Sequence, residues 1–296
     1  MKRLDSDFVS GGLRCAGWLY IPEGVRRPPV VVMAHGFAAE RSFRLPAFAE
    51  VFCREGLAVF LFDYRHFGGS EGEPKNLVSP KRQLEDWEAA LSHVRSLEEV
   101  DGGRVALWGT SFSGGHVLVT AARDHHVSAV VSQVPFVDGL ATASLLGLGF
   151  TLRAVAHGLA DALASLIGRV HHVPVVSDPD EFAVMNTPGS KEGYLSLVPE
   201  GSTWQNKCPA RTLLSVPLYR PVRHASKIRC PVLVVYAKRD TLIPPGAVEK
   251  AASKMRNVKV VGLDVGHFDV YFDPVFSEVV KMESEFLREN LLGKEP

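Results

Sequence analysis

Short, largely apolar runs alternate along this chain with longer stretches in which apolar residues recur every three or four positions. The runs 30–34, 57–62, 105–108 and 127–131 contain no charged side chain. Such runs indicate strands that are buried on both faces, as in a parallel sheet. The stretches at 45–55, 80–97 and 112–123 have helical spacing instead. This alternation predicts an α/β fold with a doubly wound, mostly parallel sheet of about eight strands.

The sequence pattern also predicts strands and helices near both ends of the chain. Residues 8–21 alternate enough for two antiparallel strands that turn at Gly11 and Gly12. Toward the C-terminus we expect strands at 231–236 and 258–263, with a helix near 246–255 between them. A terminal helix is expected over about 274–292.

Between residues 138 and 226 the buried-strand pattern stops. Residues 140–167 have helical spacing and many small side chains, and a stretch rich in proline and glycine follows. Such a long detour is unusual for a plain loop in a compact domain. We therefore predict a mostly helical cap at 138–226, inserted into a core formed by 1–137 and 227–296. A helical segment with an apolar face should cover the carboxyl ends of the strands.

Composition narrows the class of partner. The chain has 296 residues with 33 basic and 33 acidic side chains, so its formal net charge is zero. That balance argues against nucleic acid or an anionic membrane as the main partner. The longest uncharged apolar stretch is shorter than the roughly 20 residues that span a bilayer. The basic residues near the N-terminus are not followed by an apolar segment, so we expect no signal peptide and a cytoplasmic location.

Cysteine and histidine spacing give no metal signature. The four cysteines are widely scattered, and the pairs His125-His126 and His171-His172 lack a third ligand at helical spacing. We therefore expect no metal and no organic cofactor. Whether the protein forms a homo-oligomer is left open.

The candidate nucleophile is Ser111. It lies between an apolar run that ends at Trp108 and a stretch that opens with small residues, with Gly109 two positions before it and Ser113 two positions after it. A strand, a tight turn with serine at its apex and a helix form a nucleophile elbow, usually written G-x-S-x-G. Small flanking residues are needed because strand and helix approach closely there. Ser113 replaces the usual second glycine.

A serine nucleophile needs a base, and the base needs an orienting acid. Asp240 follows the apolar run that ends at Tyr236, and His267 follows the last predicted strand. The chain order Ser111, Asp240, His267 is the order expected for this architecture. Asp264 and Asp269 remain alternative acids.

Two backbone N–H groups could form an oxyanion hole. One belongs to Phe112, the residue after the nucleophile. The other belongs to Phe37, in the loop His35-Gly36-Phe37 that follows a predicted strand. His35 is expected chiefly to shape this loop.

Together these motifs resemble the α/β-hydrolase superfamily. The resemblance rests on residues 35–37, the segment Asp63 to Ser70, the Ser111 elbow, residues 238–240 and residues 266–268. It covers almost the whole chain outside the predicted cap. Within the superfamily, the chain is similar to serine esterases and to dienelactone-hydrolase-like or acyl-peptidase-like enzymes with a helical cap.

The resemblance and the intact triad imply a serine hydrolase that cleaves carboxylic esters of small to medium, largely apolar substrates through an acyl-enzyme. A peptidase, amidase or thioesterase could use the same triad, and Arg153, Arg169 or Arg211 could anchor a peptide terminus. A non-catalytic small-molecule receptor on the same fold is the remote alternative. The expected substrate-binding residues are His35, Phe136, Leu145, Leu148, Leu152, Trp204 and Tyr219. Trp204 and Tyr219, like Tyr194, could instead form the core of the cap.

Overall fold

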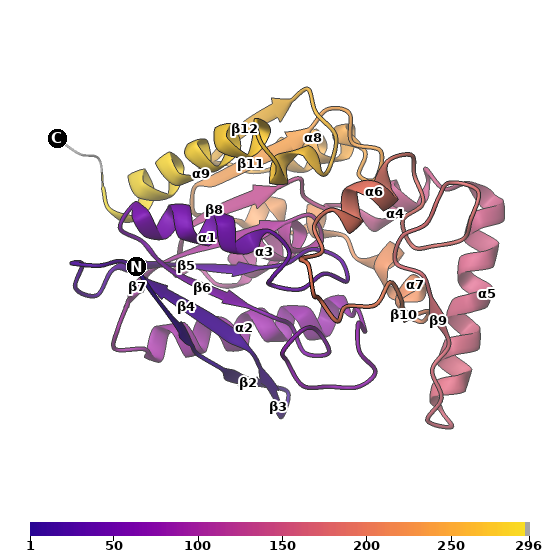
Figure 1. Cartoon of the computed structure of the whole chain (residues 1–296). Coiled ribbons are helices and arrows are strands. Elements are labelled where there is room, and N and C mark those ends of the chain that lie inside the picture. Colours follow the sequence, from indigo (N-terminus) through magenta and orange to yellow (C-terminus); the bar gives the residue numbers. More distant parts are fainter. Residues whose placement is uncertain (294–296) are drawn as a thin grey trace.

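A twisted eight-stranded sheet forms the centre of the molecule in the computed structural model, which describes residues 1–293 (Figure 1). Its neighbours are parallel, except that the pairs β1–β4 and β4–β6 are antiparallel. The predicted α/β fold with a mostly parallel sheet of about eight strands is confirmed. In spatial order the strands are β1 (Lys2–Asp5), β4 (Gly17–Ile21), β6 (Ala58–Phe62), β5 (Pro29–Ala34), β7 (Asp101–Thr110), β8 (Val127–Gln133), β11 (Val232–Ala237) and β12 (Val258–Leu263).

The expectation for residues 8–21 needs a correction. The hairpin that turns at Gly11 and Gly12 is a short separate pair, β2 (Phe8–Ser10) and β3 (Leu13–Cys15). Strand β4 lies after it in the main sheet and pairs with β1, an edge strand that the apolar pattern did not predict. Strand β1 has the sequence Lys-Arg-Leu-Asp and is largely exposed, so its residues show no apolar run.

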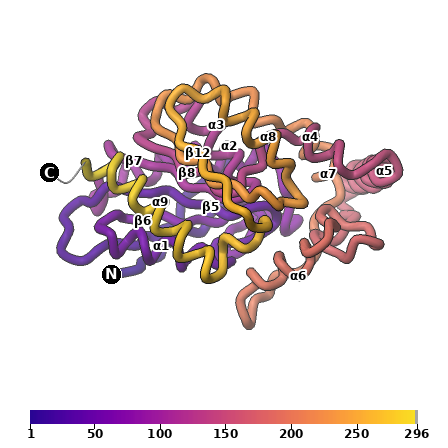
Figure 2. Tube along the Cα trace, turned by 90° about the horizontal axis from the view of Figure 1, so that it is seen from above, coloured from indigo at the N-terminus to yellow at the C-terminus, as the bar shows by residue number. Residues whose placement is uncertain are grey.

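Helices cover both faces of the sheet (Figures 1 and 2). Helices α1 (Leu45–Arg54) and α9 (Val275–Leu291) contact each other on one face, while α2 (Pro80–Ser96) and α3 (Phe112–Arg123) contact each other on the opposite face. Helix α8 (Pro245–Ala252) packs on β11. Helix α1 illustrates why these segments are helical: Leu45, Phe48 and Phe52 recur at helical spacing and are all buried.

Residues 138–226, here called the cap segment, lie for the most part at the carboxyl end of the parallel strands (Figure 1), while the last residues of the segment pack along α3. The chain leaves the sheet after β8 and returns in β11, and these two strands pair directly. Among the residues the structure describes, no helix is both long and apolar enough to cross a membrane. The elements of the cap segment are α4 (Gly139–Ala143), α5 (Gly147–Ser165), β9 (His172–Val173), α6 (Ser190–Leu195), β10 (Cys208–Pro209), α7 (Thr212–Ser215) and the 3-10 turns η1 (Val216–Leu218), η2 (Pro221–Arg223) and η3 (Ala225–Lys227).

A buried carboxyl group between α9 and the sheet, that of Glu283, makes the stability of the fold depend on pH. Glu283 of α9 is fully buried and accepts a hydrogen bond of 2.9 Å from Trp108 Nε1. Burial raises its pKa from 4.5 to about 8. The folded state therefore holds a proton that the unfolded chain releases between these two values. The contribution of Glu283 to stability is full below pH 4.5 and is lost as the pH rises toward 8.

We expect Glu283→Gln to stabilise the protein at alkaline pH. Glutamine keeps an acceptor for Trp108 and cannot ionise, so the free energy of unfolding at pH 8.5 should rise by on the order of 3 kcal/mol. Chemical denaturation at several pH values measures this, and the gain should vanish near pH 4.5. The exposed Glu285 of the same helix supplies the control Glu285→Gln. An equal gain at both pH values would contradict the ionisation argument.

Candidate active site

Ser111 lies at the apex of the tight turn between β7 and α3. Its backbone has φ 55° and ψ −118°, a conformation that residues other than glycine rarely adopt. Two backbone hydrogen bonds to the region around the end of β8 hold the turn. The Ser111 N–H donates to the Gln133 carbonyl at 2.8 Å, and the Ser111 carbonyl accepts from the Phe136 N–H at 2.8 Å. A Cβ atom at Gly109 would lie 2.4 Å from the Ser113 carbonyl oxygen. Only glycine fits at this close approach of strand and helix.

Ser111, His267 and Asp240 form a continuous hydrogen-bonded relay. Ser111 Oγ lies 3.0 Å from His267 Nε2, and His267 Nδ1 lies 2.6 Å from Asp240 Oδ2. The second carboxylate oxygen of Asp240 accepts the backbone N–H groups of Leu242 and Ile243 at 2.8 and 2.9 Å. These bonds fix the carboxylate so that it faces the imidazole. The candidate nucleophile, base and orienting acid are thus within hydrogen-bonding reach of one another.

The two alternative acids are placed elsewhere. The side chain of Asp264 is 81% exposed and lies 3.4 Å from Arg239 Nε. Asp269 accepts the Gly266 N–H at 2.7 Å and thereby shapes the loop that carries His267. In this structure Asp240 is the carboxylate that contacts the imidazole.

The loop of residues 36–39, here called the oxyanion loop, runs close to the nucleophile. A Cβ atom on Gly36 would lie 3.0 Å from Ser111 Cβ, so glycine lets the backbone approach. Within the described part of the chain, the backbone N–H groups of Phe37 and Phe112 have no hydrogen-bond acceptor. Their rings pack edge to face at 5.5 Å. Two unpaired donors beside the nucleophile are what an oxyanion hole requires.

His35 supports this loop from the core. It is fully buried, and burial lowers its pKa to about 3, so its ring is neutral at physiological pH. Because a carbonyl oxygen can only accept, Nδ1 donates to the Gly36 carbonyl at 3.0 Å. His35 lines neither of the pockets beside Ser111. Its expected role in substrate binding is therefore corrected to support of the loop.

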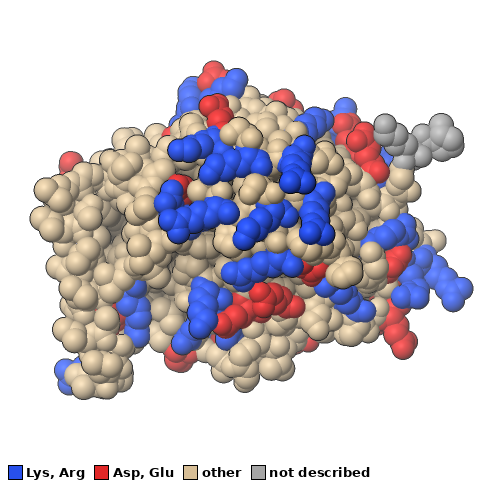
Figure 3. Space-filling model, turned by 180° about the vertical axis from the view of Figure 1, so that it is seen from behind, with Lys and Arg blue, Asp and Glu red and all other residues tan. Residues whose placement is uncertain are grey.

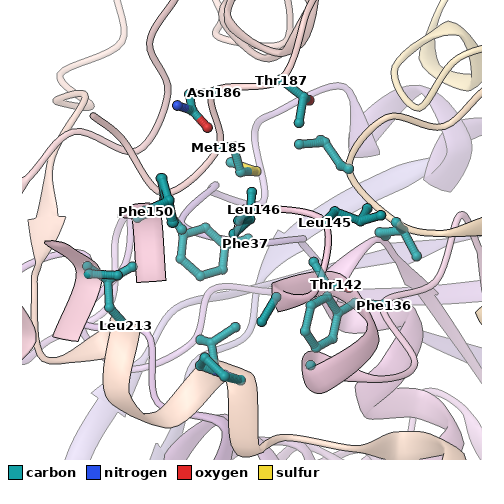
Figure 4. A pocket seen from close by; sticks show the side chains of 18 of the residues that line it. Phe37, Phe136, Thr142, Leu145, Leu146, Phe150, Met185, Asn186, Thr187 and Leu213 are labelled. Atoms are coloured by element: carbon teal, nitrogen blue, oxygen red, sulfur yellow. The ribbon is translucent and has the colours of Figure 1, made fainter. Parts of the chain in front are cut away.

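An apolar cavity of about 150 Å³ opens beside Ser111. Figure 4 shows side chains that line it. The core supplies Phe37 and Phe112, and the cap segment supplies most of the remaining wall. Among the described residues, none with a charged side chain lines it. The cap residues that Figure 4 labels around this pocket are Thr142, Leu145, Leu146, Phe150, Met185, Asn186, Thr187 and Leu213.

Ser111 also lines a second, smaller cavity of about 20 Å³. Ser111, Phe37 and Met185 line both cavities, whereas His267 lines only the smaller one. Its wall also includes Tyr194 of the cap segment. Ser111 is thus shared by two cavities of different size.

The pocket contains only some of the expected lining residues. Phe136 and Leu145 line it, but Leu148 and Leu152 do not. Leu148 and Leu152 are 75% and 62% exposed, on the outer face of α5. The end of the molecule that carries α5, on the left in Figure 3, has few charged side chains on the face shown. The assignment of these two leucines is corrected, because α5 turns its small residues inward.

Trp204 and Tyr219 also lie outside the pocket. Trp204 donates from Nε1 to the Ala38 carbonyl at 2.8 Å. The ring of Tyr219 stacks parallel to that of Phe136 at 6.3 Å, and its hydroxyl contacts His116 Nδ1 at 2.7 Å. Trp204 thus contacts the oxyanion loop, and Tyr219 packs against the pocket residue Phe136.

Sequence reasoning missed several lining residues of the cap segment. Phe150, Val155, Met185 and Leu213 are the main examples. Phe150 precedes the buried Ala154 by four positions, and Ala154 precedes the buried Gly158 by four more. The small residues Ala154 and Gly158 in this row were a signal for the inward face of α5.

The structure gives no sign of a metal centre. In the described range 1–293, no group of three histidine, cysteine or acidic side chains could hold a metal ion.

Comparisons with known proteins show the family to which the chain belongs. The family model described as serine aminopeptidase S33 matches residues 27–262. The chain is 41% identical to the quorum-quenching protein AidA of Acinetobacter baumannii over 96% of this chain and 94% of the relative. It is 29% identical to the polyketide transferase af380 of Aspergillus fumigatus, over 98% and 99% of the two chains.

A solved structure resembles the whole chain. The structure of DcsB in complex with its substrate analogue superimposes with a TM-score of 0.88 at 27% identity, covering 99% of this chain and 100% of the other. The match of the family model alone extends over more than half of the sequence. This chain therefore belongs to the α/β-hydrolase superfamily, in the family that the serine aminopeptidase S33 model describes.

Proposed function

We propose that the protein is a serine hydrolase that cleaves carboxylic esters with small to medium, largely apolar acyl groups. The observation that carries the proposal is the relay of Ser111, His267 and Asp240 beside a pocket without charged lining. A pocket of this kind suits an apolar acyl chain and offers no ionic anchor.

In the proposed mechanism, Ser111 Oγ attacks the ester carbonyl carbon while His267 Nε2 takes its proton. The N–H groups of Phe37 and Phe112 bind the oxyanion of the tetrahedral intermediate. His267 returns the proton to the leaving alkoxide, which departs as an alcohol. Water then attacks the acyl-enzyme with His267 as general base, and the carboxylic acid is released.

The two cavities support an assignment of the substrate's two halves. The leaving oxygen must lie within reach of His267 Nε2 to receive its proton, and His267 lines only the smaller cavity. The apolar cavity contacts Ser111 and both expected oxyanion residues without His267. We therefore place the acyl chain in the apolar cavity and the leaving group toward the smaller cavity that His267 lines. In this proposal the cap segment 138–226 is an inserted domain that sets acyl specificity.

The positions of the cap arginines argue against a peptidase. Arg153 lies over the ring of Phe182 at 4.9 Å, and Arg211 is paired with the buried Asp161 at 2.7 Å. Neither these two nor Arg169 lines the apolar pocket. A receptor is also disfavoured, because all three members of the relay are present.

The test is a substrate panel. We expect hydrolysis of p-nitrophenyl esters from acetate to palmitate, with an optimum at intermediate length, and no hydrolysis of aminoacyl anilides. Thioesters of the preferred acid, compared with its oxygen esters, separate esterase from thioesterase activity. The similarity to a relative named as a polyketide transferase makes acyl transfer to an alcohol worth measuring in the same reactions. Anilide cleavage without ester cleavage would contradict the proposal.

The apolar pocket allows a matched pair of variants on one helix. Val155 lines the pocket and is partly exposed, so a larger side chain can extend into the cavity, while Leu152 points outward. We expect Val155→Trp to lower kcat/KM for the octanoate ester relative to the acetate ester by about 10-fold. Leu152→Trp should leave this ratio unchanged. Equal ratios for the two variants would show that this wall does not set acyl length.

A further inference from the structure

Two side chains of the cap segment bind consecutive carbonyl groups of the oxyanion loop. Tyr194 Oη donates to the Phe37 carbonyl at 2.9 Å, and Trp204 Nε1 donates to the Ala38 carbonyl at 2.8 Å. These bonds join residues more than 150 positions apart. They are direct polar contacts between the cap segment and the backbone that carries the Phe37 N–H.

The oxyanion loop depends on such external support. Its internal backbone bond, from the Ala39 N–H to the Gly36 carbonyl, is long at 3.5 Å. Ala38 has φ 51°, a left-handed conformation that is unfavourable for alanine. His35 holds the Gly36 carbonyl from the core side, as described above. With Tyr194 and Trp204, three successive carbonyls of the loop are each held by a side chain.

The two donors are themselves rigidly placed. Tyr194 is only 3% exposed, and its ring packs against those of Trp204 and Phe43, with centroid distances of 5.4 and 6.2 Å. Helix α6 also contacts the loop that carries the base, since a Cβ atom on Gly193 would lie 2.3 Å from the ring of Phe268. Residues 193–204 therefore touch both the oxyanion loop and the segment beside His267.

We propose that Tyr194 and Trp204 are positioning residues that orient the Phe37 N–H toward the oxyanion, so that the cap segment sets the geometry of the hole as well as the shape of the pocket. This inference rests on the proposed serine hydrolase function. An oxyanion donor works only when it lies about 2.7–3.1 Å from the developing charge. The Phe37 N–H belongs to the Gly36–Phe37 peptide unit, whose carbonyl His35 holds, and Tyr194 and Trp204 fix the next two peptide units. A shift of those two units would displace the backbone of Phe37 and its N–H with it. Loss of the bond from Tyr194 or Trp204 should therefore destabilise the transition state more than it weakens substrate binding.

The test uses Tyr194→Phe and Trp204→Phe, which remove one donor each and keep an aromatic ring. For the preferred p-nitrophenyl ester, we expect each variant to lower kcat about 5- to 10-fold and to change KM less than about 2-fold. A trifluoromethyl ketone with the same acyl chain forms a tetrahedral adduct with the serine. Its inhibition constant should rise by the same factor as kcat falls.

Tyr236→Phe is the matched control, because the Tyr236 hydroxyl bonds Glu249 and does not touch the oxyanion loop. It should leave kcat and the inhibition constant unchanged. A purely structural role for Tyr194 and Trp204 predicts a lower melting temperature with unchanged kcat and unchanged ketone affinity at 25 °C. That result overturns the inference.

Failure of the underlying function has a different signature. If a fluorophosphonate does not label Ser111 of the wild-type protein and the ketone does not inhibit, both the function and the inference are overturned. If the wild-type protein is labelled and hydrolyses esters, but both Phe variants match it in kcat, only the inference is overturned.

Discussion

Ser111→Ala should reduce ester turnover by about 10⁴-fold or more while leaving the fold intact. The substitution removes the hydroxyl that is placed 3.0 Å from His267 Nε2 and adds no volume to the elbow. Alanine would occupy a strained backbone conformation that serine already occupies, so the melting temperature should change little. Initial rates with the preferred p-nitrophenyl ester, together with a thermal melt, measure both effects.

The control is a serine from the same turn. Ser113 is fully buried two positions further on, and its hydroxyl contacts Tyr64 Oη at 2.8 Å rather than the relay. Ser113→Ala should therefore affect stability more than the labelling of Ser111 by a fluorophosphonate. Near-normal turnover in a folded Ser111→Ala protein would rule out the covalent mechanism. His267→Ala should produce a loss as large as that of Ser111→Ala, because the two act as one unit.

The elbow and its partners could be predicted from the sequence because each lies directly after an apolar strand. Parallel strands end at the same edge of a sheet, so the residues after β7, β11 and β12 must meet there. Strand order and short motifs were therefore enough to bring Ser111, Asp240 and His267 together. The polar edge strand β1 showed no apolar run and was missed.

The wall of the pocket could not be predicted in the same way. In α5 the usual pattern is reversed, since Ala154 and Gly158 face inward while Leu148 and Leu152 face solvent. The reason is close packing on α7: a Cβ atom on Gly158 would lie 2.7 Å from Leu214 Cγ. A periodic apolar pattern identifies a helix. It does not show which face is buried when the face that carries small side chains packs against the neighbouring helix.

The contacts of Tyr194 and Trp204 with the oxyanion loop were beyond sequence reasoning for another reason. Aromatic residues in an irregular, proline-rich segment have no periodicity that would indicate their direction. Their place follows only from the tertiary arrangement, in which their rings and that of Phe43 pack together. The sequence left open whether they formed the cap core or lined a pocket. Tyr194 lines the smaller cavity and also packs in this aromatic cluster.

Asp240→Asn should reduce kcat by up to about 10⁴-fold with little change in KM. An asparagine side chain can present its N–H₂ group to His267 Nδ1, which favours the tautomer with the proton on Nε2. That tautomer cannot accept the proton of Ser111. The two backbone bonds from Leu242 and Ile243 to the side-chain oxygen can persist, so the loop should keep its shape.

Asp264→Asn is the matched comparison for this prediction. Asp264 is largely exposed and lies beside Arg239, so its neutralisation should change kcat less than about 2-fold. Both variants should be compared with the wild-type protein over pH 5–9, because loss of the orienting carboxylate also removes the charge that stabilises the imidazolium. A mild effect of Asp240→Asn together with a severe effect of Asp264→Asn would reverse the assignment of the acid. The 2.6 Å contact between Asp240 Oδ2 and His267 Nδ1 argues for the opposite result.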